Sequence, residues 1–526
     1  MLDDQRIVKA TSNITQRAEK QKDIDKILKT FVDIGIVPQI NNINDQIIYG
    51  RRGTGKTHVL KVLQNKVESD TNKASVYIDC RTLGSTAQFS DSSVPTQKRC
   101  TALFKDILEP IHSRVLNYIV DNPPDQKEQQ EEVLDLSDRL ASVVTQAVKR
   151  YDQVSETRTA SKESQARGNI EVNVSSTGPK AGAGTGRSSS ESGEVTSTYD
   201  VETEDKIIFP SLYKSLSNIL ELSDLQLFIL IDEWAAIPED IQPYLAEFLK
   251  RGVLPVRRSA LKVATLEYRT SFRKEGSEPI IGFELGADIS TAVDLDDYYV
   301  YDRNPEQITD VFSEILYKHI TSDLDDGYMS NKHSIDNGED LSTRLFTQRK
   351  IFRELVRAAE GVVRDLLNIY QTAFFDAKRR GRDTIDQNAV IDSSREWFEK
   401  DKSQGLDEKM ESVLESIVSQ VIGEKKARSF MVPRELQDHP MIQRLFDERV
   451  IHKMEKGYAD KDNPGRRYDI YTLDYGTYVD LKGTKSEPEY TLFSGIKNKN
   501  DDIVVPFDDK RSIRRIILDK EVLEPY

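Results

Sequence analysis

The sequence predicts an α/β protein in which a parallel sheet with helices on both faces is followed by a helical bundle and a small α+β domain. Between residues 43 and about 304, short apolar runs alternate with segments of helical periodicity. This alternation is typical of a parallel sheet covered on both faces. From about 305 to 400 the periodicity is helical throughout, and beyond 402 helices precede short runs rich in Tyr and Ile. The 526 residues exceed what one hydrophobic core holds, so several domains are expected.

The expected domain boundaries follow the same changes of pattern. We expect a helical segment at 1–42, the α/β core at 43–304, the helical domain at 305–400, the α+β domain at 401–485 and an extension at 486–526. An insertion at 123–205 interrupts the core; it is charged and helical to about 151, then rich in Ser, Thr, Gly and Glu. Such a composition buries too little apolar surface to offset the cost of ordering. A surface insertion is the simpler interpretation, and a hairpin near 169–174 that touches a partner or DNA is the alternative.

Composition argues against several classes of protein. Acidic residues outnumber basic ones by 89 to 74, and the net charge of −15 argues against a protein that coats nucleic acid, although a local basic surface is compatible with it. Two cysteines, Cys80 and Cys100, cannot form a disulfide framework. No apolar run is long enough to cross a bilayer, and the first residues lack the apolar core of a signal peptide. We therefore expect a cytoplasmic protein with no membrane partner.

The elements of the core are predicted in chain order from their apolar patterns. A strand at Asp45–Tyr49 leads into a glycine-rich loop, and an amphipathic helix follows the loop. Further strands are expected at Ala74–Cys80, Leu225–Ile231 and Leu261–Leu266, and further helices at about 97–121 and 238–251.

The glycine-rich loop Gly50–Thr57 fits the phosphate-loop pattern G-x-x-x-x-G-K-[ST]. Its glycines let backbone N–H groups turn toward phosphate oxygens, and the following helix points its positive end at them. Lys56 is suited to the β and γ phosphates and the Thr57 hydroxyl to Mg²⁺. ATP is the expected ligand. We assign its binding to Gly50, Gly53, Thr54, Gly55, Lys56, Thr57 and the following His58.

An acidic pair, Asp232 and Glu233, ends the apolar strand two strand–helix units after the loop. Parallel strands deliver their last residues to one edge of the sheet, so the pair should lie beside the phosphate loop. Asp232 is expected to hold Mg²⁺ together with Thr57, and Glu233 to accept a proton from the attacking water. The sequence therefore predicts a Mg²⁺-dependent ATPase. The alternative for such a pair is a helix cap.

Three segments resemble the origin-recognition-complex-like family of AAA+ ATPases: Val76–Thr82, the Ile-Asp-Glu end of the acidic strand, and Glu360–Leu367. Two further stretches, Asp232–Leu245 and Asp297–Pro305, resemble an uncharacterised bacterial branch of that family, which is linked to mobile-element or phage-defence loci. The resemblance implies a P-loop NTPase parallel sheet, an α-helical AAA+ lid and a C-terminal winged-helix-like α+β domain.

In the lid of such a protein, Gly361-x-x-Arg364 is the motif that faces the nucleotide. The resemblance implies that the glycine permits close helix approach, and that Arg364 senses the γ phosphate and couples it to rotation of the lid. A solvated arginine on a helix surface is the alternative.

The end of the fourth strand departs from the family pattern, which usually has a polar residue such as Asn there. The candidates in this chain are Thr265 and Glu267. Glu267-Tyr268-Arg269 resembles instead the strand-end arginine of the related signal-transduction (STAND) ATPases. Arg269 and Arg273 are the candidates for an arginine that reaches the nucleotide of a neighbouring subunit, with Arg257 and Arg258 as competitors. Homo-oligomerisation is therefore left open.

Helices at about 410–422 and Glu435–Glu448, then strands at Arg449–Lys456 and Arg467–Leu473, match what a winged helix needs. The turn between the strands carries Lys461, Arg466 and Arg467, which suit a phosphate backbone, although Asp460 and Asp462 lie among them. Duplex DNA bound through 402–485 and docking to a protein are the two interpretations.

These features together predict an ATP-driven switch that binds DNA, or loads or recruits a separate effector protein on it. The rival interpretation is a STAND-like signalling scaffold, which oligomerises when it meets a partner and does not use DNA.

Overall fold

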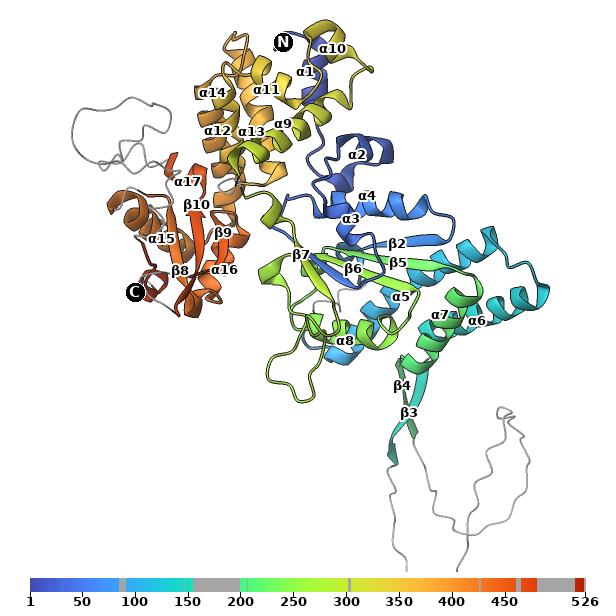
Figure 1. Ribbon diagram of the computed structural model, residues 1–526. Coiled ribbons are helices and arrows are strands. Elements are labelled where there is room, and N and C mark those ends of the chain that lie inside the picture. The colour runs from blue at the N-terminus through green and yellow to red at the C-terminus, as the bar shows by residue number, and fades with distance from the viewer. Residues whose placement is uncertain are drawn as a thin grey trace, which may run out of the picture. The chain divides into compact units, whose positions relative to one another are not determined.

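The computed structural model describes residues 1–84, 91–145, 147–154, 199–205, 207–300, 304–424, 427–459, 465–479 and 516–524. The chain forms two compact units: one contains Met1–Val144 and Ile208–Tyr526, and the other contains Thr145–Ile207. The first unit holds the core, the lid and the C-terminal domain (Figure 1). None of the helices in the described ranges combines the length and the apolar character needed to cross a bilayer.

The core of the first unit is a five-stranded parallel sheet in the order β2-β5-β6-β1-β7. Because β6 lies between β1 and β5, the phosphate loop after β1 and the acidic pair after β5 flank the end of β6. The strands are β1 (Gln46–Tyr49), β2 (Lys73–Asp79), β5 (Gln226–Asp232), β6 (Ser259–Thr265) and β7 (Thr291–Asp294). The helices of this part are α4 (Lys56–Glu68), α5 (Thr96–Asp121), α6 (Lys127–Thr145), α7 (Phe209–Leu222) and α8 (Gln242–Gly252).

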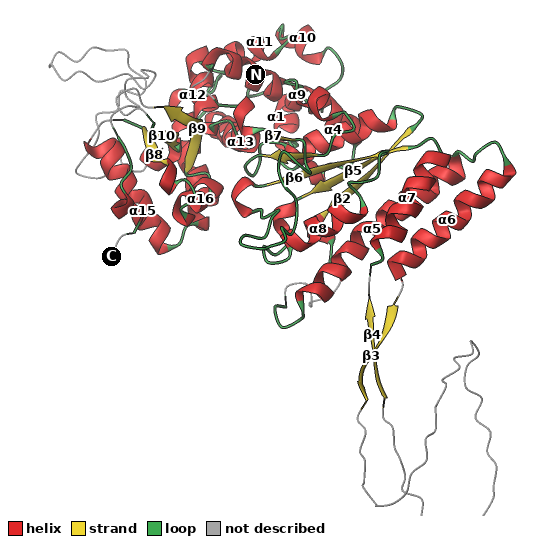
Figure 2. Cartoon of the chain, turned by 60° about the horizontal axis from the view of Figure 1, so that its bottom comes forward, coloured by secondary structure: helices red, strands yellow, loops and turns green. Residues whose placement is uncertain are grey.

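Helices cover both faces of the sheet, as the alternation of side chains along buried strands requires (Figure 2). Phe228 and Leu230 of β5 pack in one cluster with Leu60 and Leu63 of α4. On the other face, Phe104 of α5 lies within 5.5 Å of the ring of α8's Phe248, measured between ring centroids. The predicted parallel sheet with helices on both faces is confirmed.

The lid is helical, and the N-terminal segment packs on it. Tyr370 in the lid accepts or donates a 3.1 Å hydrogen bond with Thr11 of α1, and Leu2 and Ile7 join the lid's hydrophobic core. The helices are α1 (Gln5–Ser12), α2 (Ile24–Thr30), α3 (Ile36–Ile40), α9 (Pro305–Thr321), α10 (Tyr328–His333), α11 (Gly338–Leu345), α12 (Arg349–Ala359), α13 (Val363–Arg379) and α14 (Gln387–Trp397).

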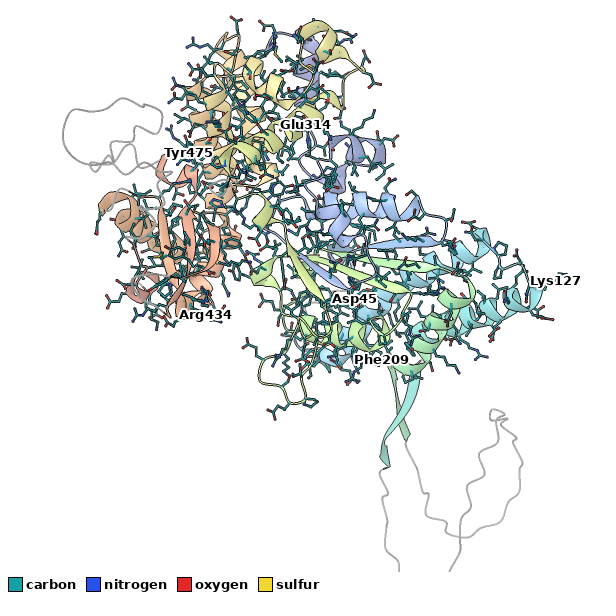
Figure 3. The ribbon with its side chains drawn as sticks, viewed as in Figure 1. Asp45, Lys127, Phe209, Glu314, Arg434 and Tyr475 are labelled. Carbon is teal, nitrogen blue, oxygen red and sulfur yellow. The ribbon has the colours of Figure 1, made fainter. Side chains whose placement is uncertain are left out.

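The C-terminal domain has the element order of a winged helix and a three-stranded antiparallel sheet, β8-β10-β9. Its elements are α15 (Glu408–Val418), β8 (Ser429–Pro433), α16 (Pro440–Asp447), β9 (Ile451–Ala459), β10 (Arg467–Leu473), α17 (Tyr475–Val479) and α18 (Lys520–Leu523). Tyr475, labelled in Figure 3, is 1% exposed and belongs to a single hydrophobic core shared by the lid and this domain. Lid and C-terminal domain are therefore packed as one body.

Several elements differ from the predictions. The charged segment is helical only to Thr145, because β3 (Ala147–Val154) follows and pairs antiparallel with β4 (Tyr199–Asp205) in the second unit. The patterns of β7 and β8 are too short for periodicity to reveal them. The expected helix at Glu435–Glu448 begins only at Pro440, and β9 begins at Ile451, after Arg449 with its φ of 63°. The proposed hairpin arm near 169–174 lies outside the described residues.

Candidate nucleotide-binding site

The phosphate loop turns tightly between β1 and α4. Gly53 has φ +87°, a conformation that other residues rarely adopt. A Cβ on Gly53 would lie 2.7 Å from the Cβ of Arg364, so the loop needs glycine both for its turn and for the close approach of the lid. Gly55 precedes α4, and no side chain caps the first turn of this helix. The N–H groups of that turn are therefore available to an anion.

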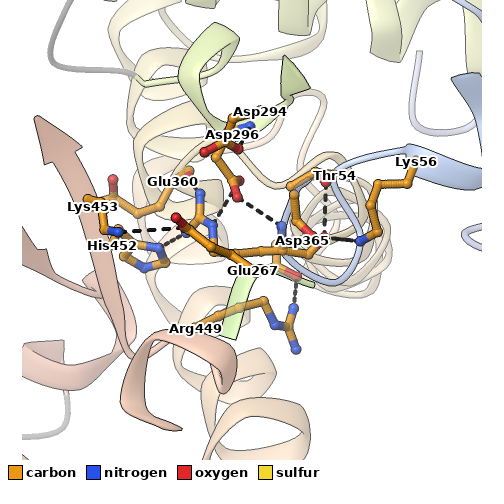
Figure 4. Close-up of polar contacts among 12 residues, drawn as sticks. Thr54, Lys56, Glu267, Asp294, Asp296, Glu360, Asp365, Arg449, His452 and Lys453 are labelled. Atoms are coloured by element: carbon orange, nitrogen blue, oxygen red, sulfur yellow. Dashed lines mark hydrogen bonds and ion pairs between the residues drawn. The ribbon is translucent and has the colours of Figure 1, made fainter. Parts of the chain in front are cut away.

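Lys56 is buried at the start of α4 and folds back on the loop (Figure 4). Its Nζ donates hydrogen bonds to the carbonyl oxygens of Gly50 (2.7 Å) and Arg51 (3.0 Å). An ammonium group has three protons, and these two bonds use two of them. Burial lowers the pKa of Lys56, while the nearby carboxylates of Glu233 and Asp232 raise it. A buried cation of this kind is stabilised by an additional anion.

Thr57 and Asp232 meet at the end of the sheet. The Thr57 hydroxyl donates to Oδ2 of Asp232 at 2.7 Å, and the Tyr77 hydroxyl donates to the same oxygen at 2.7 Å. Asp232 has no exposed surface. A hydroxyl and a carboxylate oxygen side by side are the ligands that Mg²⁺ prefers, so these residues fit the predicted ion.

Glu233 adopts a strained backbone conformation at the end of β5. Its φ of 55° and ψ of 41° lie in the left-handed region, which costs a residue with a Cβ on the order of 1 kcal/mol. Burial, followed by the charge of Asp232, raises the pKa of the Glu233 carboxyl group above its usual value. The strain turns the side chain out of the strand, and Glu233 lines the cavity described below. A raised pKa suits a group that must accept a proton.

Arg364 lies directly over the phosphate loop. Its backbone N–H donates to the carbonyl oxygen of Gly53 at 3.1 Å, in the first turn of α13. Gly361, with φ +80°, makes this approach feasible, because a Cβ there would lie 2.6 Å from the carbonyl oxygen of Tyr299. Nε of Arg364 is buried and has no hydrogen-bond partner within the described part of the chain. A half-buried guanidinium whose buried Nε lacks a partner fits an anionic ligand.

A cavity of about 430 Å³ joins these residues, and its volume is that of a typical small-molecule site. Its lining includes Lys56, Thr57, Glu233 and Arg364. His58 lines it as well, and its ring Nε2 is hydrogen-bonded to the carbonyl oxygen of Ile27 (2.7 Å). Seven basic side chains and four acidic ones contribute to the lining. This excess of positive charge, the uncapped helix and the unpartnered Arg364 Nε fit a nucleotide polyphosphate.

The other arginines singled out in the sequence lie elsewhere. Arg269 pairs with Asp447 (2.9 Å) and Glu448 (2.8 Å) of the C-terminal domain of the same chain, and Arg273 is exposed on the loop after β6. Arg257 and Arg258 precede β6, whose opposite end lies near the phosphate loop, so they are at the far edge of the sheet. None of the four lines the cavity.

The two fourth-strand candidates are also outside the cavity. The hydroxyl of Thr265 bonds to that of Thr270. The carboxylate of Glu267 pairs with Lys456 (3.3 Å) and Lys453 (3.6 Å), which belong to β9. The end of β6 therefore contacts the C-terminal domain.

Sequence reasoning missed several groups that line the cavity, among them the N-terminal segment around Ile14 to Thr30, His319 of α9, and Asp401, Glu448 and Arg449 further along the chain. No motif marks the first group, whose lining residues are mostly polar and lie at least 20 positions before the loop. His319 and Arg449 come from distant parts of the chain, and no local pattern marks them.

His319 gives the protein a predicted sensitivity to acid. Burial lowers the pKa of His319 to about 4, with smaller lowering contributions from His58 and Lys26, although the Ile315 carbonyl oxygen accepts its Nδ1 proton (2.8 Å). The unfolded chain takes up this proton near pH 6.5. Stability is therefore complete above pH 6.5 and is lost as the pH falls toward 4, by about 3 kcal/mol.

Replacing His319 with glutamine removes this contribution, so urea unfolding of the variant should depend less on pH between 6.5 and 4 than unfolding of the wild type does. If the free energy of unfolding changes equally with pH in the two proteins, His319 is not the source of the acid sensitivity.

Comparison with known proteins links the chain to one family. Residues 14–89, which include β1, the phosphate loop, α4 and β2, match the ORC-CDC6-like family model. None of the curated protein sequences with which the chain was compared is similar to it. Solved structures with some likeness include Cdc6p of Pyrobaculum aerophilum (12% identity, 90% of this chain and 95% of that chain, TM-score 0.33). They also include ORC2 of Aeropyrum pernix (11% identity, 91% of this chain and 96% of that chain, TM-score 0.37). A third is the RuvB motor of Thermotoga maritima (9% identity, 89% of this chain and 98% of that chain, TM-score 0.32).

Similarity this low gives no basis for transferring activity or partners from those structures. The matched segment contains the phosphate loop itself. Over residues 14–89, the chain is similar to the ORC-CDC6-like family.

Proposed function

We propose that this protein binds and hydrolyses ATP with Mg²⁺ and uses the nucleotide to position its lid and C-terminal domain. The observation that carries the proposal is the cavity, which receives Lys56 from α4, Glu233 from the end of β5 and Arg364 from α13. These groups supply a cation for phosphates, a carboxylate with a raised pKa and a guanidinium from the lid. Few other ligands need all three at one place.

The residues divide the chemistry between them. Lys56 and the N–H groups at the start of α4 would bind the phosphate oxygens. Thr57 and Asp232 would hold Mg²⁺, which neutralises phosphate charge when it is bound. Glu233 would accept a proton from the attacking water, and burial favours this by raising its pKa. His58 contributes a ring to the wall of the cavity.

Arg364 connects the nucleotide to movement of the lid. Its backbone is hydrogen-bonded to the loop and its guanidinium lacks a partner for Nε, so a γ phosphate would tie lid and loop together. The C-terminal domain shares the lid's hydrophobic core, and so it would move with the lid when hydrolysis removes that phosphate. The proposed moving body comprises the lid at 305–400 and the domain at 401–485.

The proposed partner of the C-terminal domain is duplex DNA, or an effector protein recruited to it. Arg466, at the end of the turn between β9 and β10, and Arg467, the first residue of β10, are exposed where a winged helix contacts a phosphate backbone. Lys461 of the same turn lies outside the described residues. A role in bacterial defence or in mobile elements is a hypothesis that rests on the sequence resemblance alone.

Reversing both charges, Arg466→Glu with Arg467→Glu, should weaken binding of a duplex oligonucleotide by on the order of tenfold at low salt, because two phosphate contacts are lost. Fluorescence anisotropy across a salt series measures this, and the salt dependence should become shallower. The matched control is Lys400→Glu with Lys409→Glu, which makes the same change of charge at two exposed lysines outside the turn. Equal affinity of the two double variants would exclude the wing as the DNA surface.

The experiment that tests the whole proposal is ATP turnover of the purified protein with and without duplex DNA, with its mass measured in each state. Mg²⁺-dependent turnover supports the ATPase assignment, and a change with DNA supports the DNA switch. A protein that neither binds nor hydrolyses ATP would refute the proposal.

One observation favours the rival function, a STAND-like signalling scaffold. Arg269, the arginine that would act on a neighbouring subunit, is paired with Asp447 and Glu448 of its own chain. A C-terminal domain docked on its own nucleotide site would keep the protein closed until a partner releases it. Nucleotide-dependent oligomerisation in the mass measurement, without any affinity for DNA, would support the scaffold.

A further inference from the structure

The turn between α16 and β9 brings the C-terminal domain to the nucleotide cavity. Glu448 and Arg449 of this turn line the cavity, although they are separated by almost 400 positions from the phosphate loop. Arg449 has φ +63°, an unfavourable conformation for a residue with a side chain. Backbone strain of this kind persists where the surrounding contacts hold it in place.

Arg449 is held by two carboxylates and keeps one donor unused. Its side chain is 5% exposed, and it pairs through Nη1 with Asp365 and through Nη2 with Asp401 (Figure 4 shows the first pair). Nε of Arg449 is buried and has no hydrogen-bond partner among the residues that the structure describes. An unsatisfied donor of a buried guanidinium costs stability unless a ligand accepts from it.

Arg449 and Arg364 present two guanidinium groups to the same cavity, and in neither does Nε have a partner among the described residues. Burial, and next the charge of Arg449, lowers the pKa of Arg364. Like charges held this close repel each other, and an anion between them removes the repulsion. Asp365, beside Arg364 in the chain, and Asp401 both pair with Arg449 and offset its charge, so the two Nε donors are what this part of the cavity offers to an anion.

We propose that Arg449 is a second guanidinium ligand for the phosphate chain of the nucleotide, supplied by the C-terminal domain. This inference rests on the proposed function, because it assumes that the cavity takes a nucleotide. The nucleotide would then be held by the core through Lys56, by the lid through Arg364 and by the C-terminal domain through Arg449. The C-terminal domain is a direct part of the site, in addition to being carried by the lid.

The phosphate loop itself is fastened to the same domain. Arg51 of the loop bonds to His452 of β9, donates to the carbonyl oxygen of Glu360 (3.0 Å) and pairs with Asp296 (2.9 Å). His452 donates to Asp474 (2.8 Å), which also binds Lys402. Lys402 lies 3.2 Å from Asp365, the partner of Arg449. A buried chain of hydrogen bonds and ion pairs thus runs from the loop through the neutral ring of His452 to Arg449, and it fixes the C-terminal domain where Arg449 reaches the cavity.

The test compares two buried arginines of the C-terminal domain that both pair with acids of the lid. Arg449 lines the cavity, whereas Arg428, 2% exposed and paired with Glu360 (3.0 Å), does not. Arg449→Lys keeps a charge, but one ammonium cannot reproduce the fork that holds two carboxylates and a ligand. Arg428→Lys makes the same change outside the cavity. Binding of a fluorescent ATP analogue and of its ADP counterpart is measured for both variants, with melting temperature recorded without nucleotide.

We expect Arg449→Lys to weaken binding of the analogue about tenfold and Arg428→Lys to change it less than about twofold. If melting temperature and nucleotide affinity fall by the same amounts in the two variants, Arg449 has a structural role only and the inference fails. A wild-type protein that binds neither analogue would instead refute the proposed function. Binding by the wild type and by Arg449→Lys with equal affinity refutes the inference alone.

Discussion

Replacing Lys56 with alanine should weaken ATP binding by on the order of a hundredfold or more, so that no binding is detected at micromolar ATP. Lys56 is the buried cation at the base of the cavity, and two of its protons are committed to carbonyl oxygens of the loop. The remaining proton and the charge are what the phosphates would gain. Isothermal titration with ATP, with and without Mg²⁺, measures the loss.

The control for this change is Lys66→Ala, which removes an exposed lysine from the last turn of the same helix. It should bind ATP as the wild type does. Unchanged ATP affinity in Lys56→Ala would show that the loop does not hold the phosphates, and the proposed function would be lost with it.

Replacing Glu233 with glutamine should leave ATP binding within a few-fold of the wild type and lower the turnover rate by roughly a hundredfold to ten-thousandfold. Glutamine has almost the same shape, so the left-handed backbone at this position and the lining of the cavity are kept. It cannot accept a proton at neutral pH. Phosphate release under saturating ATP measures the rate, and titration of the same sample measures binding.

Glu239→Gln is the matched control, because Glu239 is an exposed carboxylate six positions further along the chain. Its turnover should equal that of the wild type. Full turnover by Glu233→Gln would leave the phosphate-binding assignment intact but would remove Glu233 as the group that accepts the proton. The two variants of the site therefore separate binding from chemistry.

The docked C-terminal domain changes the interpretation of the strand-end residues. Glu267 and Arg269 were candidates for a sensor and for an arginine that acts on a neighbour. In this structure both pair with the C-terminal domain of their own chain, Glu267 with Lys453 and Lys456 and Arg269 with Asp447 and Glu448. Release of these pairs would be needed before Arg269 could reach another subunit. Any assembly that uses Arg269 in that way requires the C-terminal domain to move first.

Much of the fold was predictable because each of its strong signals is local. The alternation of apolar runs with helical segments marks the parallel sheet, and the loop Gly50–Thr57 lies between its predicted strand and helix. The strands β7 and β8 were not predicted, because segments of four and five residues show too little hydrophobic periodicity. The helix expected at Glu435–Glu448 was predicted too long. The helix α16 begins at Pro440, because proline is favoured at the first position of a helix.

The sequence by itself predicted the phosphate loop and the acidic pair after β5, since each depends on residue types at fixed short spacing. The lid motif Gly361-x-x-Arg364 was implied by the family resemblance. The tertiary structure alone decided which of them share a cavity, and it added His319 and Arg449 to its walls. It also decided that Arg269 pairs with Asp447, a residue 178 positions away. Contacts over such distances come from packing the lid and the C-terminal domain around one core, and no local pattern of residues encodes them.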